Sequence, residues 1–264
     1  MKINALQDRA ALLSAIEKNA PPQYFTFLRE RYYPKMIAVE GGQFKMGSSN
    51  ERDDEKPPHE VRVSSFKMAE SETTVWQYFL FQKATKHREP ETPSFQWKGD
   101  NPIVNVSWDD AMAYAIWLSE RQSIKVNLPT EAEWEFAARG GVKSKGYTYS
   151  GSNDFNEVAW YSSNSKSQTH AVKQLKANEL GLFDMSGNAY EWCRDNYSTT
   201  FYAECEKKGI VVNPFFEDEK ADYRVLRGGS WLSNPGLVRA AFRDRVNPLN
   251  RDNVVGLRVV ARYD

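Results

Sequence analysis

The hydrophobic pattern predicts three amphipathic helices in the middle of the chain. Residues 75–82 place apolar side chains at i, i+3 and i+4, and Thr73 or Thr74 precedes them as an N-cap. Residues 107–118 begin with Ser-Trp-Asp-Asp, which has the form of a capping box with Asp in place of the usual Glu or Gln. Residues 130–138 begin with a full capping box, and a Gly-Gly pair follows them, so we expect the third helix to end there.

Short apolar runs predict β-strands on both sides of these helices. The candidates are residues 36–39, 61–63, 191–192, 225–226 and 255–260, the last expected to close the protein as one core strand. Residues 141–180 are rich in turn formers and indicate loops around a buried Trp-Tyr pair, while residues 198–222 have the character of an insertion. The pattern therefore predicts an α+β protein with much irregular loop.

The chain divides into a helical extension and a main domain. Residues 3–18 and 23–32 carry apolar positions at helical spacing, separated by a Pro-Pro pair. We interpret residues 1–35 as an N-terminal helical extension packed on a main domain of residues 36–264. A loosely attached leader is the alternative.

The C-terminal run, residues 223–264, has no period of 2 or 3.6 between its two apolar ends. Asn, Arg and Asp dominate it, and isolated apolar residues interrupt them at no fixed spacing. From Leu232 to Asp264 the chain contains no Lys, Glu, Gln, Met or Trp, although the preceding residues use all five. Chance and a preference for Arg over Lys would give this composition; a restricted codon set would give it as well.

Charge and cysteine content exclude several classes of protein. The formal net charge is +0, so no long-range field attracts nucleic acid or an anionic membrane, and we expect no nucleic-acid partner. No apolar run is long enough for a membrane span. The two cysteines, Cys193 and Cys205, show no zinc spacing, and we expect buried free thiols in preference to a single bridge.

Motifs for catalysis are lacking, and we assign no catalytic and no metal-ligating residue. The three histidines have no second His or Cys at ligand spacing, and no nucleophile elbow or phosphate-binding loop is present. Residues 184–191 carry oxygen donors for a structural calcium ion without the EF-hand spacing, and a purely structural turn is the favoured interpretation. The arginines of the C-terminal run are expected as buried forks that hold loop carbonyls, with anion binding as the alternative.

Several motifs in order give the chain a resemblance to a known family. They are GGQFKMGS at 41–48, EKPPHEVRV at 55–63, NPIVNVSWDDAMAYAIWLSERQ at 101–122, LPTEAEWEFAARGG at 128–141, NELGLFDMSGNAYEWC at 178–193, RVLRGGSW at 224–231 and GLRVVA at 256–261. Together they resemble the sulfatase-modifying, formylglycine-generating family. The resemblance implies a C-type lectin fold of the formylglycine-generating type, which is α+β and poor in regular structure.

The resemblance also implies what this chain does not do. The enzymes of that family oxidise a substrate cysteine with two cysteines near their C-terminus. This sequence reads Arg-Ala-Ala-Phe-Arg at 239–243, where those cysteines would stand, and has no cysteine after Cys205. Because a thiolate supplies the soft metal ligand and the redox partner, we expect no such activity here.

The C-terminal run resembles the variable region of proteins that retroelements diversify through adenine-directed mutagenesis, such as the variable protein of Treponema. Their mutated codons have the form NNY, which cannot encode Lys, Glu, Gln, Met or Trp, the set missing after Trp231. The resemblance assigns ligand contact to the following residues, called here the candidate positions: Leu232, Ser233, Asn234, Gly236, Leu237, Phe242, Asp244, Arg245, Val246, Asn247, Leu249, Asn250, Asp252, Asn253 and Val254.

The sequence therefore favours a ligand-binding display protein over an enzyme of altered chemistry or an assembly subunit. We expect Phe242 and the arginines to be the anchors of a surface that binds a protein or a surface glycan. We expect a monomer without a cofactor, apart from the calcium alternative. The resemblance implies a lipoprotein at the cell surface; this chain has no lipobox, and without export it would be cytoplasmic.

Overall fold

The computed structural model describes residues 32–262, so both predicted N-terminal helices lie outside the described residues except at Tyr32. Tyr32 is buried edge-on against Trp76, with 6.0 Å between ring centroids, and Tyr33 stacks on Trp117 at 6.3 Å. The chain thus enters the domain across the helices that carry these two tryptophans. The prediction that residues 1–35 form a helical extension stays a prediction.

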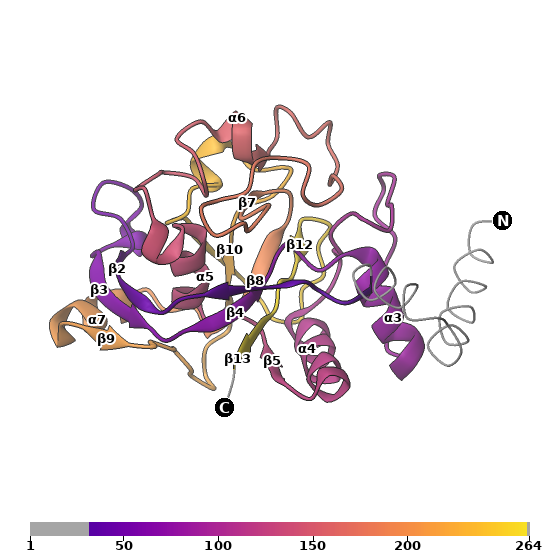
Figure 1. The fold of residues 1–264 in the computed structure, drawn as a ribbon, viewed down its shortest axis with the longest axis horizontal. Coiled ribbons are helices and arrows are strands. Elements are labelled where there is room, and N and C mark those ends of the chain that lie inside the picture. Colours follow the sequence, from indigo (N-terminus) through magenta and orange to yellow (C-terminus); the bar gives the residue numbers. More distant parts are fainter. Residues whose placement is uncertain (1–31, 263–264) are drawn as a thin grey trace.

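Two four-stranded sheets form the centre of the molecule (Figure 1). The first is antiparallel in the order β1-β4-β13-β5, with bounds Met36–Val39, Phe66–Ala69, Val260–Arg262 and Lys125–Asn127. The second has the order β11-β10-β8-β12, with bounds Arg243–Val246, Arg224–Arg227, Tyr190–Asn196 and Val255–Gly256. In this sheet β12 pairs parallel with β8, and the other neighbours are antiparallel. The strand order places β11 at one edge of the sheet.

Two smaller sheets lie beside them. One has the order β2-β3-β9 (Gly42–Met46, His59–Val63 and Val211–Val212), and the other pairs β6 (Ala159–Trp160) with β7 (Ser186–Gly187). The strand β9 and the helix α7 (Phe201–Lys208) belong to the segment interpreted as an insertion. Because β9 pairs with β3, and Tyr202 and Cys205 of α7 are buried, this segment is an integral part of the core.

The three predicted helices are confirmed, each with its cap. They are α3 (Val75–Thr85), α4 (Trp108–Gln122) and α5 (Glu131–Ala138), and their N-caps Thr74, Ser107 and Thr130 each form a complete capping box. The remaining helices are short: α6 (Phe155–Val158), η1 (Asp53–Glu55), η2 (Gly141–Lys143) and η3 (Pro235–Leu237).

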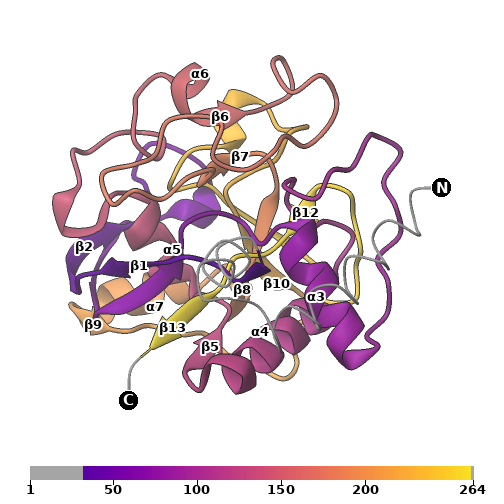
Figure 2. The ribbon, with the colours of Figure 1, turned by 45° about the vertical axis from the view of Figure 1, so that its right-hand side comes forward.

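The core has two main parts, which the strands β8 and β10 join. One part packs α3 and α4 against the C-terminal strands, and the other packs α5 against the sheet of β2 and β3. Figure 2 shows the same separation, with α3 and α4 on the side of the molecule away from β2, β9 and α7. Loops and α6 cover the end at which β7 lies (Figure 1).

Residues 255–260 do not form the single strand that was predicted. They divide into β12 and the start of β13, which belong to different sheets. Between them lies Arg258, which is 0% exposed and pairs with Glu191 of β8. The chain therefore crosses from one sheet to the other at a buried guanidinium group, while the carbonyls of Leu257 and Val259 accept hydrogen bonds from the amides of Thr73 and Ala69.

Candidate ligand-binding face

Buried ion pairs attach the C-terminal run to the rest of the domain. Arg243 binds Glu131 at the start of α5 through two hydrogen bonds of 2.8 and 2.7 Å. Arg227 reaches Glu135 of the same helix, and both arginines are buried. Removing one partner of such a pair leaves an unpaired buried charge, at a cost of about 3–5 kcal/mol, so these contacts fix the position of β10 and β11.

The same arginines hold carbonyl groups of irregular backbone, which confirms the expectation of buried forks. Arg227 donates to the carbonyl oxygens of Ala240 at 2.9 Å and Ala241 at 3.1 Å, and Arg243 donates to that of Asp54 at 3.0 Å. The guanidinium groups thereby satisfy backbone acceptors that no strand or helix would pair.

The carboxylate partners of these arginines were not identified from the sequence. Glu131 was assigned only to a helix start, although Glu131 and Glu135 stand four residues apart and therefore share one face of α5. Both are buried beside Trp134 and Ala138. Two glutamates at i, i+4, on a helix that also carries Trp134, Phe136 and three alanines, were the signal, because buried carboxylates need cationic partners.

Glu135 stays ionised in this setting. Burial alone would raise the pKa of its carboxyl, but the nearby Arg139 and Arg227 outweigh burial, and the pKa lies below its ordinary value. A third pair, Arg239 with Glu55 at 2.7 and 2.9 Å, fastens the loop before β3 to the C-terminal run.

Most candidate positions have exposed or partly exposed side chains. Leu232 and Leu249 are 61% and 67% exposed and belong to the few large apolar side chains on the described surface. The exposed candidate positions are Leu232, Asn234, Gly236, Arg245, Asn247, Leu249 and Asn250; the partly exposed ones are Leu237, Asp244, Val246, Asp252, Asn253 and Val254.

Two candidate positions have buried side chains, so the prediction that these two contact a ligand is wrong. Phe242 is 1% exposed and belongs to the core cluster of α3 and α4, with the Arg52 guanidinium 5.2 Å from its ring centroid. Ser233 is 5% exposed because its hydroxyl accepts a hydrogen bond from the Ser230 amide at 3.0 Å. Phe242 is therefore a packing residue and not a surface anchor.

Direct contacts connect the candidate positions into one region. The Trp231 indole donates to the Asn253 carbonyl at 3.0 Å, which places the segment after Trp231 beside residues 252–254. The Tyr190 hydroxyl lies between Ser233 and Asp244, and burial raises its pKa to about 12. Residues 244–246 follow the free edge of β11, and the chain continues from there into residues 247–250.

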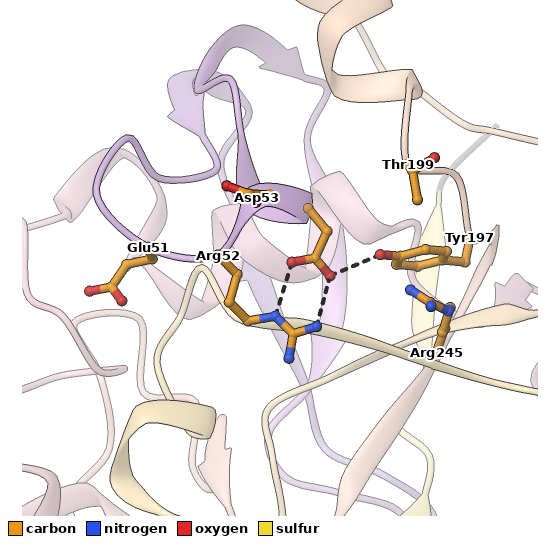
Figure 3. Close-up of a pocket in the computed structure, with 7 residues that line it drawn as sticks. Glu51, Arg52, Asp53, Tyr197, Thr199 and Arg245 are labelled. Atoms are coloured by element: carbon orange, nitrogen blue, oxygen red, sulfur yellow. Dashed lines mark hydrogen bonds and ion pairs between the residues drawn. The ribbon is translucent and has the colours of Figure 1, made fainter.

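A pocket of about 650 Å³ opens where this region meets the loop before η1. Arg245 is the candidate position that lines it, and the other lining residues are Glu51, Arg52, Asp53, Asp54, Tyr197 and Thr199. Arg52 binds Asp54, whose carboxylate also accepts the Tyr197 hydroxyl at 2.8 Å, and the dashed lines that start at Arg52 and Tyr197 in Figure 3 mark these contacts. Burial alone would raise the pKa of Asp54, but these two partners outweigh it and the pKa is lowered.

The thiols do not form a catalytic pair. Cys193 and Cys205 are free and buried, which confirms the expectation from the sequence. Burial raises the pKa of the Cys193 thiol well above its ordinary value and that of Cys205 to about 11, so both remain protonated at neutral pH. Ala240 and Ala241 are buried where the enzyme would carry its cysteines.

The oxygen donors suggested for calcium are engaged in other contacts. Glu191 accepts from the Trp134 indole at 2.6 Å and pairs with Arg258, and Asp184 accepts from the Lys173 amide at 2.8 Å. Within residues 32–262, His, Cys, Asp and Glu side chains form no group of three or more suited to a metal ion.

The small sheets, long loops and buried arginine pairs define a C-type lectin-like scaffold of the formylglycine-generating type. The chain belongs to the family of sulfatase-modifying factor enzyme 1-like domains, whose model matches residues 24–263.

Curated relatives differ widely in what their names describe. The chain is 31% identical to serine/threonine-protein kinase Pkn1 of Chlamydia trachomatis, over 89% of this chain but only 40% of that protein. It is 30% identical to chaperone protein LppX of Paenibacillus barcinonensis, over 85% of this chain and 88% of the relative. It is also 30% identical to inactive C-alpha-formylglycine-generating enzyme 2 of Bos taurus, over 75% of this chain and 76% of the relative.

Two solved structures share the fold. Treponema denticola variable protein 1 matches with a TM-score of 0.72 and 26% identity, over 86% of this chain and 95% of that one. PvdO from Pseudomonas aeruginosa matches with a TM-score of 0.76 and 25% identity, over 87% and 95%. These similarities confirm the predicted fold and the family resemblance. None of the helices in the described part of the chain has the length and apolar character needed to cross a bilayer.

Proposed function

We propose that this chain is a non-catalytic ligand-binding protein that acts at the cell surface as a monomer. Its ligand, a protein or a surface glycan, contacts the exposed and partly exposed candidate positions. The observation that carries the proposal is that neighbouring residues alternate between buried residues that anchor the strand and exposed residues that can contact a ligand. Arg243 is buried and paired with Glu131, whereas Arg245, two residues on, is exposed at the pocket.

This division suits a surface whose side chains change while the fold stays constant. Exposed substitutions away from special features usually change stability by less than about 0.5 kcal/mol. None of the candidate positions is an arginine of a buried ion pair, that is Arg227, Arg239, Arg243 or Arg258. Diversification of the candidate positions therefore leaves these ion pairs intact. Retroelement diversification belongs to the proposal, and the residue types missing after Trp231 support it.

The experiment is a binding screen with matched variants. A panel of recombinant cell-surface proteins and a glycan array are probed with the wild-type chain and with a variant carrying Ser at every fully exposed candidate position, which leaves intact the partly buried ones that pack against the core. A control variant carries Ser at exposed residues of α4 and of the start of β5, such as Ile116, Arg121 and Lys125. We expect the first variant alone to lose binding while all three chains keep their melting temperature. Equal binding by the wild type and the first variant would remove the proposal.

Natural alleles give an independent test against the enzyme alternative. Changes confined to the candidate positions among alleles of this locus support display. Invariant polar residues around a cleft, together with changes elsewhere, would favour catalysis.

A further inference from the structure

Arg245 has no carboxylate partner among the described residues, in contrast to several other arginines of the C-terminal run. Arg227, Arg239 and Arg243 pair with buried glutamates, and Arg251 pairs with Asp110 at 2.9 Å. Arg245 instead lies over two aromatic rings, 4.5 Å from the centroid of Tyr197 and 5.8 Å from that of Tyr223. Its hydrogen-bond donors therefore remain available to a ligand.

The aromatic rings hold this guanidinium group in position. Arg243 and Arg245 are two residues apart on β11 and face the same side, so both contact the Tyr197 ring, Arg243 at 4.7 Å. The Tyr197 hydroxyl is fixed in turn by Asp54 at 2.8 Å (Figure 3). A guanidinium group that is stacked before binding loses less conformational freedom when it binds a carboxylate.

The other charges of the pocket already have partners. Arg52 binds Asp54 at 3.0 Å, and Asp53 pairs with Lys56 at 3.0 Å. Glu51 approaches Arg239 at 3.7 Å. The carboxylates of Asp53 and Glu51 are themselves exposed, and the 3.7 Å approach of Glu51 to the buried Arg239 is long, so these acids still repel an extended polyanion that passes over the rim. The pocket suits one compact carboxylate and disfavours a chain of anionic groups.

We propose that Arg245 is a specificity-determining residue that binds a single carboxylate of a protein ligand, an Asp or Glu side chain or a C-terminus. The Thr199 hydroxyl on the same pocket wall supplies a further donor. The exposed Tyr223 beside Arg245, 45% exposed, adds the aromatic contact area typical of protein interfaces. The inference rests on the proposed function and narrows its ligand to a protein with an acidic contact residue.

The test uses small carboxylates as probes. The Nε–Hε resonance of Arg245 is followed by NMR while the full chain is titrated with N-acetylglutamate α-methylamide, which carries a single side-chain carboxylate, and with N-acetylglutamine α-methylamide as the neutral isostere. We expect a saturable shift with the carboxylate only, and binding at least about tenfold weaker in Arg245→Gln, because a charge-assisted bidentate contact is lost. The control Arg121→Gln removes an exposed arginine that stacks on Trp117 of α4 and should bind like the wild type.

Several outcomes overturn the assignment. They are no saturable shift, an equal response to the neutral N-acetylglutamine α-methylamide, or unchanged binding in Arg245→Gln with an unchanged melting temperature. Binding of N-acetylneuraminic acid at least about tenfold tighter than that of N-acetylglutamate α-methylamide would replace the protein carboxylate with that of an acidic glycan. If the titration fails while replacement of the candidate positions still abolishes ligand binding, only the role of Arg245 is lost and the proposed function stands.

Discussion

At the scale of single residues, apolar side chains that stand in the same kind of sequence context differ widely in their exposed fraction. Phe242 and Leu249 both stand in a polar run without periodicity, yet one is 1% exposed and the other 67%. Phe242 directly precedes β11, whose first residue Arg243 is drawn inward by Glu131, and its ring enters the core of α3 and α4. Leu249 lies in the loop after β11, where no strand or buried pair directs it inward.

Truncating these two side chains should therefore have very different effects. Phe242→Ala is expected to lower the free energy of unfolding by about 3–5 kcal/mol, because it removes buried apolar surface and leaves a cavity. Leu249→Ala should change it by less than about 0.5 kcal/mol. Urea denaturation followed by tryptophan fluorescence measures both, and similar losses in the two variants would contradict the assignment of Phe242 to the core.

The same contrast explains which features the sequence could predict. The capping boxes at Thr74, Ser107 and Thr130 depend on residues three apart, so a local pattern identifies them. The pair of Arg243 with Glu131 spans 112 residues, and that of Arg239 with Glu55 spans 184. The i, i+4 spacing of Glu131 and Glu135 marks carboxylates that need partners, but no local pattern identifies which arginine each of them binds.

At the scale of elements, the helix α5 connects the core to the candidate face. Its first turn supplies Glu131 to Arg243, and its third residue, Glu133, closes the capping box and pairs with Arg262 of β13 at 2.6 Å. Eight residues are too few for an isolated helix to be stable in water. Its cap and its ion pairs therefore hold the helix in place, and the position of the helix in turn fixes that of β11.

Loss of the cap should weaken this connection without removing it. Thr130→Ala deletes the hydroxyl that accepts from the Glu133 amide at 3.2 Å and is expected to cost about 1 kcal/mol. Thr199→Ala, at an exposed threonine of the pocket, should cost nothing measurable. Thermal unfolding of the two variants separates these outcomes, and an unchanged melting temperature in Thr130→Ala would show that the ion pairs of Glu131 and Glu133 alone hold the helix start.

At the scale of the whole molecule, stability depends on how buried acids balance buried bases. Glu131, Glu135 and Glu191 each have a guanidinium partner, and such pairs keep their charge in the interior. Asp184 has a weaker arrangement, since its carboxylate accepts the Lys173 amide and forms no ion pair with any residue of the described range 32–262. Burial raises its pKa to about 6.

Asp184 should therefore make the protein less stable as the pH rises. Between the pKa of the unfolded chain, about 3.9, and the folded value, the native state binds the additional proton, so stability is lost as the pH rises through about 6. Asp184→Asn keeps an acceptor for the Lys173 amide and tolerates the left-handed backbone at φ 58. Relative to the wild type, the variant should gain about 1.4 kcal/mol in the free energy of unfolding between pH 5 and pH 8.

Asp222→Asn, at an exposed position, is the matched control and should follow the wild type at both pH values. Urea unfolding at pH 5 and pH 8 provides the comparison. Because other buried groups titrate equally in all three chains, their contributions cancel in the difference between variants. An Asp184→Asn variant that parallels the wild type would mean that Asp184 is ionised throughout this range, and that the nearby Arg258 compensates its charge despite lying against Glu191.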